Sequence, residues 1–135
     1  MKVKVTPSKV HGNVKIPASK SMAHRALICA SLSDGTSIVS NVTNSKDIEA
    51  TVGCMKALGA NIKQIDETTY EVTGTNLFEQ EGNITCNANE SGSTLRFLIP
   101  LAACTNAKVK FLGQGRLLQR PMDVYENEFK EQNIE

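Results

Sequence analysis

Residues 16–32, IPASKSMAHRALICASL, place hydroxyl and basic side chains directly in front of an apolar segment with helical spacing. Ser19 follows Pro17 and suits the N-cap of a helix, and Gly35 suits its end because glycine adopts left-handed backbone readily. The start of a helix carries unpaired backbone N–H groups and the positive end of the helix dipole. This stretch therefore predicts a helix whose first turn can bind an anion. Its buried face would consist of Ala23, Ala26, Leu27 and Ala30.

Side chains of the same stretch add donors to this helix start. Lys20 supplies a mobile ammonium group and Ser21 a hydroxyl. Arg25 lies one turn beyond Ser21 on the same face, where its planar guanidinium can bind a carboxylate through two hydrogen bonds. The alternative is that Ser19 only caps the helix, while Lys20 and Arg25 are solvated. We interpret His24 as a neighbour on the polar face of the helix and not as a catalyst.

A second cationic helix start is predicted in residues 89–97, NESGSTLRF. Gly92 permits close approach of a ligand to the backbone, Ser93 and Thr94 supply hydroxyls, and Arg96 lies one turn into the helix. Taken alone, this pattern is also typical of ordinary helix capping.

The third cationic segment is residues 113–122, GQGRLLQRPM. A residue before proline favours extended backbone, so Arg120 is predicted to project from a stiff loop in front of Pro121. The alternative for this segment is a surface loop with Arg116 and Arg120 exposed.

The rest of the chain alternates short strands with amphipathic helices, which predicts an α/β (α+β) fold. A second helix is expected over residues 46–58, with Asp47 in its first turn, and a third from about residue 91, with a kink at Pro100. The strands on either side of residues 66–69 read as a hairpin. The predicted strands are residues 2–5, 12–16, 36–42, 61–65, 69–74, 83–86 and 107–112.

Composition limits the function. The 135 residues carry a formal net charge of +1, which gives no reason to expect nucleic acid or a membrane surface as a partner. We interpret the four widely spaced cysteines as buried free thiols in a reducing compartment, with one disulfide pair as the alternative. No apolar run approaches membrane-spanning length, so we expect a soluble cytoplasmic protein. The two histidines and the scattered cysteines predict no metal site.

Together the three cationic segments resemble the enolpyruvyl transferases, and within them the EPSP synthase branch. The resemblance lies in residues 17–27, PASKSMAHRAL, in residues 91–102, SGSTLRFLIPLA, and in residues 111–122, FLGQGRLLQRPM. Residues 34–62 are similar to the strand and helix that follow the first motif. The sister branch, which acts on a UDP-linked aminosugar, usually has Ala-Lys-Asn in the first motif and a cysteine in the third, and this chain has neither.

The resemblance implies transfer of the carboxyvinyl group of phosphoenolpyruvate to the 5-hydroxyl of shikimate 3-phosphate, without cofactor or metal. Lys20 would contact phosphoenolpyruvate, bind shikimate 3-phosphate and lie near the attacking hydroxyl, as the catalytic residue. Ser21 and Arg25 would hold the shikimate carboxylate.

The other two motifs supply the remaining residues that the resemblance implies. Gly92 and Ser93 would line the phosphoenolpyruvate pocket, and Arg120 would bind the anionic groups of that substrate. Asp47 and Arg96 would have supporting roles.

Enzymes of this family have two domains, each built from three βαβαββ units with helices packed on mixed four-stranded sheets in an inside-out barrel. Residues 1–135 would correspond to about two units of the first domain, and the strand within residues 1–10 to the sheet of the second. We therefore expect the chain to need the remaining polypeptide as its partner, and to be inactive alone. The alternatives are the aminosugar enolpyruvyl transferase and a non-catalytic anion-binding domain. Glu90 departs from the usual residue and places an acid beside the anion pocket.

Overall fold

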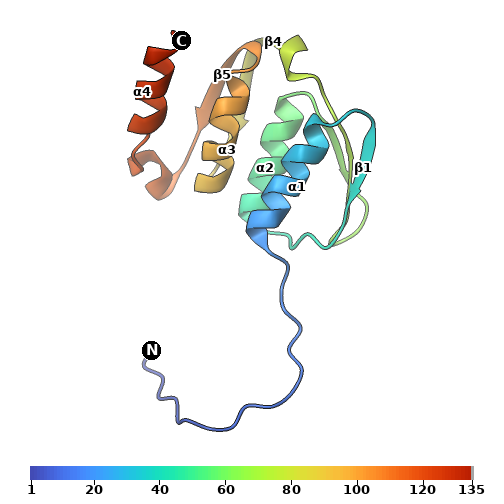
Figure 1. Ribbon diagram of the computed structural model, residues 1–135, viewed down its shortest axis with the longest axis vertical. Coiled ribbons are helices and arrows are strands. Elements are labelled where there is room, and N and C mark those ends of the chain that lie inside the picture. Colours follow the sequence, from blue (N-terminus) through green and yellow to red (C-terminus); the bar gives the residue numbers. More distant parts are fainter. Residues whose placement is uncertain (135) are drawn as a thin grey trace.

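The computed structural model describes residues 1–134, and the chain forms helices and short strands from Lys20 onward (Figure 1). None of the helices in this range is both long and apolar enough to span a membrane. The elements are α1 Lys20–Leu32, β1 Thr36–Val39, α2 Lys46–Ala57, β2 Asn61–Gln64, β3 Tyr70–Thr73, the 3-10 helix η1 Leu77–Glu79, β4 Glu81–Asn87, α3 Gly92–Ala102, β5 Asn106–Leu112, the 3-10 helix η2 Gly115–Gln119 and α4 Asp123–Glu131.

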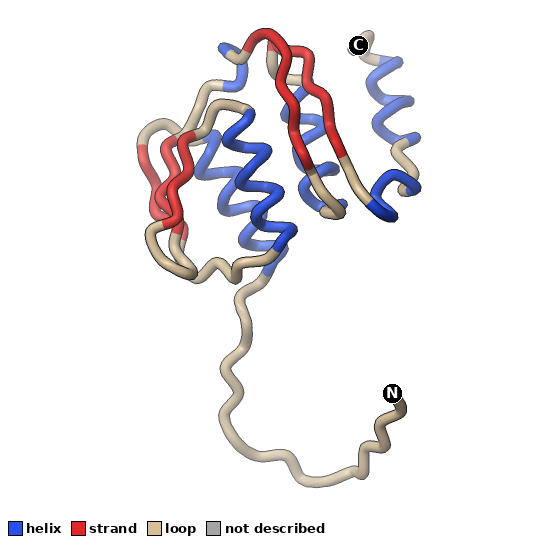
Figure 2. Tube along the Cα trace, turned by 180° about the vertical axis from the view of Figure 1, so that it is seen from behind, coloured by secondary structure: helices blue, strands red, loops and turns tan. Residues whose placement is uncertain are grey.

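The strands form two sheets, and the first three helices fill the space between them (Figures 1 and 2). The first sheet is antiparallel with the order β1-β3-β2, and α1 and α2 cover one face of it. The second sheet pairs β4 with β5 in parallel, with α3 as the connection between them. The predicted α/β class is confirmed, although the described sheets contain three and two strands where the resemblance implies four.

The predicted hairpin on either side of residues 66–69 is confirmed as the antiparallel pair β2–β3. Ile62 and Val72 face each other across the pair and are both buried. In the turn, the Asp66 carboxylate accepts a hydrogen bond from the backbone N–H of Thr68, at 2.8 Å. A local acceptor of this kind fixes the conformation of the turn. The turn then sets the register of the two strands.

The strands predicted over residues 2–5 and 12–16 are wrong. Residues 1–19 contain neither helix nor strand and extend away from the body of the molecule (Figure 2). Their valines and isoleucine alternate as in a strand, but the side chains of Val3, Val5 and Ile16 are exposed. A strand needs a neighbouring ladder for its N–H and C=O groups, and none of the described strands pairs with this segment.

The three long helices begin where the sequence predicts, because each has a serine N-cap. Ser19, Ser45 and Ser91 each accept a hydrogen bond from a backbone N–H one turn on, at 3.4, 3.3 and 3.2 Å. Each such cap satisfies one of the N–H groups that a helix start leaves unpaired and is worth about 1 kcal/mol. Gly35 follows α1 with a φ of 82°, as predicted for the end of that helix.

The core lies between the helices and the two sheets, and it contains one residue that we expected outside. His24 is buried, with 2% of its surface exposed, and its Nδ1 lies 2.7 Å from Thr51 Oγ1 on α2. The interpretation of His24 as a polar-face neighbour is therefore wrong, because α2 covers that face of α1. Ala26, predicted to be buried, is exposed instead. The largest fully buried side chains are Leu27, Ile48, Met55, Leu58 and Leu98.

All four cysteines are free, as predicted, but only two of them are buried. Cys54 and Cys86 lie in the core, where α2 meets β4. Cys29 and Cys104 are exposed, so the prediction of four buried thiols is wrong for these two. Both lie in apolar sequence, but on helix faces or ends that no other element covers.

Pro100 lies inside α3, as predicted, and its effect on the helix is offset by a hydrogen bond from another helix. Proline has no backbone N–H, so the carbonyl of Arg96 lacks its usual helical donor. The hydroxyl of Tyr125 donates to this carbonyl at 3.1 Å. Tyr125 belongs to α4, a helix that the sequence did not predict because Met122 gives it no side-chain cap and none of its residues is buried.

We predict that Tyr125→Phe loosens α4 with little effect on the remaining core. The substitution removes only the hydroxyl that donates to Arg96, a bond worth about 0.5–1.5 kcal/mol. Backbone amides of α4 should exchange with solvent several-fold faster, as measured by hydrogen–deuterium exchange, whereas amides of α1 and α2 should be unaffected. Val124→Ala is the matched control, because Val124 lies on α4 with 65% of its surface exposed. Equal exchange in both variants would contradict the prediction.

We also predict that buried His24 makes the fold sensitive to acid. Burial lowers the pKa of His24 below its ordinary value near 6.5, and Asp47 only partly opposes this effect. Below that pH the unfolded chain binds a proton that the folded chain resists, so the free energy of unfolding should fall between pH 7 and pH 5. Asn places an amide nitrogen where the imidazole has Nδ1 but cannot become charged in this range. His24→Asn should therefore flatten this dependence in denaturant titrations.

The control for this measurement is His11→Gln. His11 lies in the exposed segment before α1, so its removal should leave the pH dependence unchanged. A His24→Asn profile that fell as steeply as that of the unsubstituted chain would show that other groups cause the acid sensitivity.

Candidate functional site

The starts of α1, α2 and α3 lie at the same end of the molecule (Figure 1). Lys20, in the first turn of α1, forms an ion pair with Asp47 in the first turn of α2, at 3.1 Å. The Asp47 carbonyl also accepts a hydrogen bond from the hydroxyl of Thr94 on α3, at 3.3 Å. Asp47 therefore joins all three helix starts, which bring three positive dipole ends to one surface.

Arg25 is held in place by its own helix and by α3. Its guanidinium donates to the carbonyl of Ser21 at 2.8 Å, which confirms the predicted placement of these residues on one face. The guanidinium also stacks on the ring of Phe97, with Cζ 4.8 Å from the ring centroid. A stacked guanidinium keeps its remaining N–H groups available in a fixed plane, which suits a carboxylate ligand.

Arg120 packs directly on Gly92, so the second and third cationic segments meet. A Cβ atom on Gly92 would overlap Nη1 of Arg120. Only glycine therefore allows the guanidinium to lie against the start of α3. The backbone of Arg120 is extended, with φ −77° and ψ 136°, as its position before Pro121 predicts. The preceding residues form the 3-10 helix η2 and not the open loop that we expected.

This end of the molecule is also the carboxyl end of the parallel pair β4–β5. The backbone N–H of Ala88 donates to Leu112 just past the two strands, and that of Gln114 donates to Asn89 at 2.7 Å. These bonds tie together the loops that carry Gly92 and Arg120. Ligands of open α/β sheets bind at this edge, because the loops that follow parallel strands converge there.

Two hollows open at these loops, and the first of them also borders α2. One, of about 520 Å³, is lined by side chains of α2 and of both loops, among them Lys46, Asp47 and Glu90. The other, of about 390 Å³, is lined by Glu90, Arg116 and Arg120, with Gly115 beneath them. Glu90 separates the two hollows, and its carboxylate rests on Gly115, where a Cβ atom would overlap it. The sequence did not single out Lys46 or Gly115 as part of this site.

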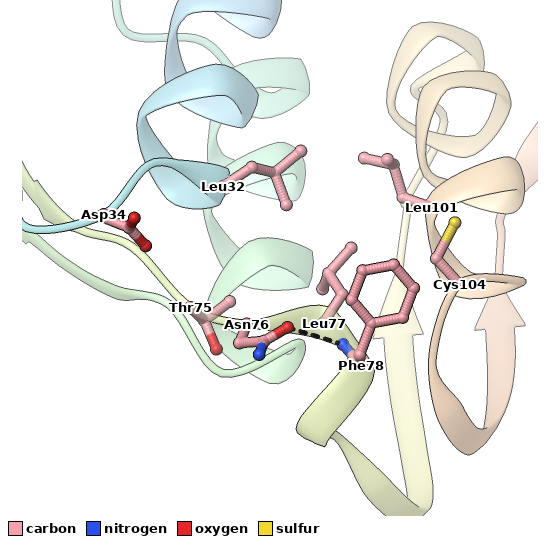
Figure 3. A pocket seen from close by; sticks show the side chains of 8 residues that line it. All are labelled: Leu32, Asp34, Thr75, Asn76, Leu77, Phe78, Leu101 and Cys104. Carbon is pink, nitrogen blue, oxygen red and sulfur yellow. Dashed lines mark hydrogen bonds between the residues drawn. The ribbon is translucent and has the colours of Figure 1, made fainter.

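A further hollow of about 450 Å³ lies at the other ends of α1 and α3 (Figure 3). It is lined by Leu32, Phe78, Leu101 and Cys104, and its one charged lining residue is Asp34. A polyanion would find no basic partner among these side chains. This hollow therefore does not suit an anionic ligand.

The sequence also missed a buried chain of polar side chains behind the site. His24 contacts Thr51, Thr51 contacts Thr94, and Thr94 contacts Ser91, with 2.7 Å between the polar atoms at each step. The first two bonds join residues 27 and 43 positions apart, so no local pattern could have indicated them.

The structure brings most of the predicted site residues to this surface. Lys20 and Asp47 are paired, Ser21 and Arg25 are joined, and Gly92 and Arg120 are in contact. The side chains of Ser93 and Arg96 are exposed on α3. The role of each of these residues stays a prediction.

Comparisons with known proteins show the family to which the chain belongs. Residues 4–135 match the family model of EPSP synthase (3-phosphoshikimate 1-carboxyvinyltransferase). The chain is 51% identical over 133 residues to the 3-phosphoshikimate 1-carboxyvinyltransferase of Clostridium perfringens strain SM101, covering 98% of this chain and 31% of that protein. It is 46% identical over 143 residues to the protein of the same name from Clostridioides difficile strain 630, covering 98% of this chain and 32% of that protein. The chain thus spans about a third of the length of these relatives.

A solved structure shares the fold. EPSP synthase from Acinetobacter baumannii superposes with a TM-score of 0.74 at 19% identity, over 92% of this chain and 28% of that one. The match of nearly the whole chain to the family model, together with these relatives, shows that the chain belongs to the EPSP synthase family.

Proposed function

We propose that the chain supplies part of a site that transfers the carboxyvinyl group of phosphoenolpyruvate to the 5-hydroxyl of shikimate 3-phosphate. In this reaction the hydroxyl gives up its proton as its oxygen bonds to C2 of phosphoenolpyruvate, and C3 gains a proton. The resulting adduct then loses inorganic phosphate and a proton from C3. Both substrates are polyanions, and the proposal is supported by the names of the relatives and by the basic side chains of Lys20, Arg25 and Arg120 near the helix starts.

One observation carries the proposal: the donors of all three cationic segments lie at the same end of the molecule. Three capped helix starts, the ammonium of Lys20 and the guanidinium groups of Arg25 and Arg120 come from segments about 100 residues apart along the chain. Fixed donors of this kind stabilise anionic ligands and developing charge without reorganisation.

We assign the shikimate 3-phosphate part of the site to α1. Arg25, stacked on Phe97 and bonded to Ser21, would bind the carboxylate in a fixed plane. Lys20 would lie between the two substrates, near the attacking oxygen. Its ion pair with Asp47 is exposed and therefore weak, so a bound phosphate can replace the carboxylate as the partner of the ammonium.

We assign the phosphoenolpyruvate part to the start of α3 and to η2. Backbone N–H groups at Gly92 and Ser93 would bind phosphate or carboxylate oxygens, and Arg120 would neutralise their charge. Arg96 would support this half of the site from the exposed face of α3.

We further propose that polypeptide corresponding to the rest of these relatives completes the site, and that the 135 residues bind substrate without turnover. Catalysis by positioning needs every contact group at once, including a general acid and base. We place the protein in the cytoplasm, which the four free thiols support.

Titration calorimetry on the 135-residue chain tests the proposal. Shikimate 3-phosphate and phosphoenolpyruvate should bind, and UDP-N-acetylglucosamine should not. Arg25→Ala should weaken binding of shikimate 3-phosphate by about 1.5–3 kcal/mol, the scale of a charge-assisted hydrogen bond. The control is Lys63→Ala, which removes an exposed positive charge from β2 and should leave the affinity unchanged.

Binding of the UDP-sugar without shikimate 3-phosphate would instead favour the sister activity. Equal losses of affinity for Arg25→Ala and Lys63→Ala would show that Arg25 contributes only through its net charge and not through a specific contact.

We predict that Gly92→Ala weakens phosphoenolpyruvate binding by displacing Arg120. The added methyl group occupies the place of the guanidinium, so the cost should be about 1.5–3 kcal/mol, as for loss of a charged hydrogen bond. Gly53→Ala is the matched control, because Gly53 lies in α2 with no atom within 4 Å of an added Cβ. It should leave binding unchanged and raise the free energy of unfolding by about 0.5–1 kcal/mol. Unaltered phosphoenolpyruvate binding in Gly92→Ala would contradict the assignment of Arg120.

A further inference from the structure

His24, Thr51, Thr94 and Ser91 form a continuous line of side chains through the interior of the molecule. Each of the four has 3% or less of its surface exposed. The contacts are His24 Nδ1 to Thr51 Oγ1, Thr51 Oγ1 to Thr94 Oγ1 and Thr94 Oγ1 to Ser91 Oγ, each 2.7 Å long. The line starts on α1, crosses α2 and ends at the residue that caps α3.

The proton positions in this line follow from the number of hydrogens available. A threonine hydroxyl carries one hydrogen and can donate once. Thr94 Oγ1 is the donor in its contacts with Ser91 Oγ at 2.7 Å and with the carbonyl of Asp47 at 3.3 Å. Its one hydrogen goes to one of these two acceptors, so none is left for Thr51. Thr51 must therefore donate to Thr94.

The same argument fixes the state of the imidazole. Thr51 donates its one hydrogen to Thr94, so it can only accept a hydrogen bond from His24. His24 must then carry a hydrogen on Nδ1, whether the ring is neutral or charged. Burial lowers the pKa of His24, so the neutral ring with Nδ1–H predominates at neutral pH.

We infer that His24 is a positioning residue, which through an ordered line of hydrogen bonds to Thr51, Thr94 and Ser91 holds the start of α3 for its anionic ligand. Each donor in the line points from α1 toward α3. Ser91 receives both the Thr94 hydroxyl and the backbone N–H of Thr94, at 2.7 and 3.2 Å. Its side chain is thereby fixed one residue before Gly92, where Arg120 packs.

The inference has two parts that fail separately. The proton order rests only on the interior geometry. The positioning role rests on the proposed function, because it requires an anion at the start of α3.

The first experiment determines the tautomer of His24 in the ligand-free chain by nitrogen NMR of ¹⁵N-labelled imidazole. His24 should have its proton on Nδ1. In Thr51→Val, which keeps the shape of the side chain but cannot accept, the Nδ1–H preference should be lost; Thr51→Ser should restore it. A proton on Nε2 alone in the unsubstituted chain would overturn the proton order.

The second experiment follows the Gly92 and Ser93 amides by NMR while phosphoenolpyruvate is added. Thr51→Val should weaken binding by about five-fold, the scale of one net hydrogen bond, and Thr51→Ser should restore most of it. Thr36→Val is the matched control, because Thr36 contacts Thr73 through a similar hydroxyl pair at 3.0 Å, exposed on the first sheet. It should leave binding unchanged.

A second pair of variants covers the case in which Thr51→Val does not fold. His24→Asn keeps an N–H donor at the position of Nδ1 and should bind phosphoenolpyruvate almost as well as the unsubstituted chain. His24→Leu lacks this donor and should bind phosphoenolpyruvate about five-fold more weakly, as expected for Thr51→Val. Equal affinity of these two variants would overturn the positioning role. Absence of any phosphoenolpyruvate binding by the unsubstituted chain would overturn it together with the proposed function, and the tautomer would still decide the proton order.

Discussion

A hydroxyl group can donate only one hydrogen, and the packing of the three central helices depends on that limit. Thr94 is fully buried where α2 and α3 meet, within hydrogen-bond distance of Thr51, Ser91 and the carbonyl of Asp47. A buried polar group without a partner costs about 1–3 kcal/mol, so an arrangement of the helices that breaks this line is disfavoured by that amount. The line therefore favours the alignment of the helix starts.

Features set by neighbouring residues could be predicted from the sequence. The serine caps, the hairpin turn at Asp66 and the extended backbone of Arg120 each depend on side chains within a few positions. The strands predicted before α1 were wrong because strand formation depends on a distant part of the chain. Its alternating valines describe a face that fits a sheet, but the strand forms only where another strand pairs with it.

The residues of the candidate site could be singled out from the sequence, but their arrangement in space could not. Sequence patterns identified Lys20, Arg25, Gly92 and Arg120, because helix starts and residues before proline have local signatures. That Arg120 rests on Gly92 depends on how two loops past parallel strands converge, and no spacing indicates it. His24 was misplaced for a related reason. Its burial is caused by α2, whose Thr51 lies 27 residues further along the chain.

The proline in α3 has a consequence for the order in which the chain folds. An isolated helix of nine residues is marginal in water, and none of the residues of α4 is buried. Its tyrosine binds a carbonyl that is free only because Pro100 interrupts the ladder of α3. That acceptor exists in the right place only after α3 has formed. The unpaired carbonyl of α3 is thus the point at which α4 attaches. We therefore expect α4 to be the last helix to form and the first to unfold.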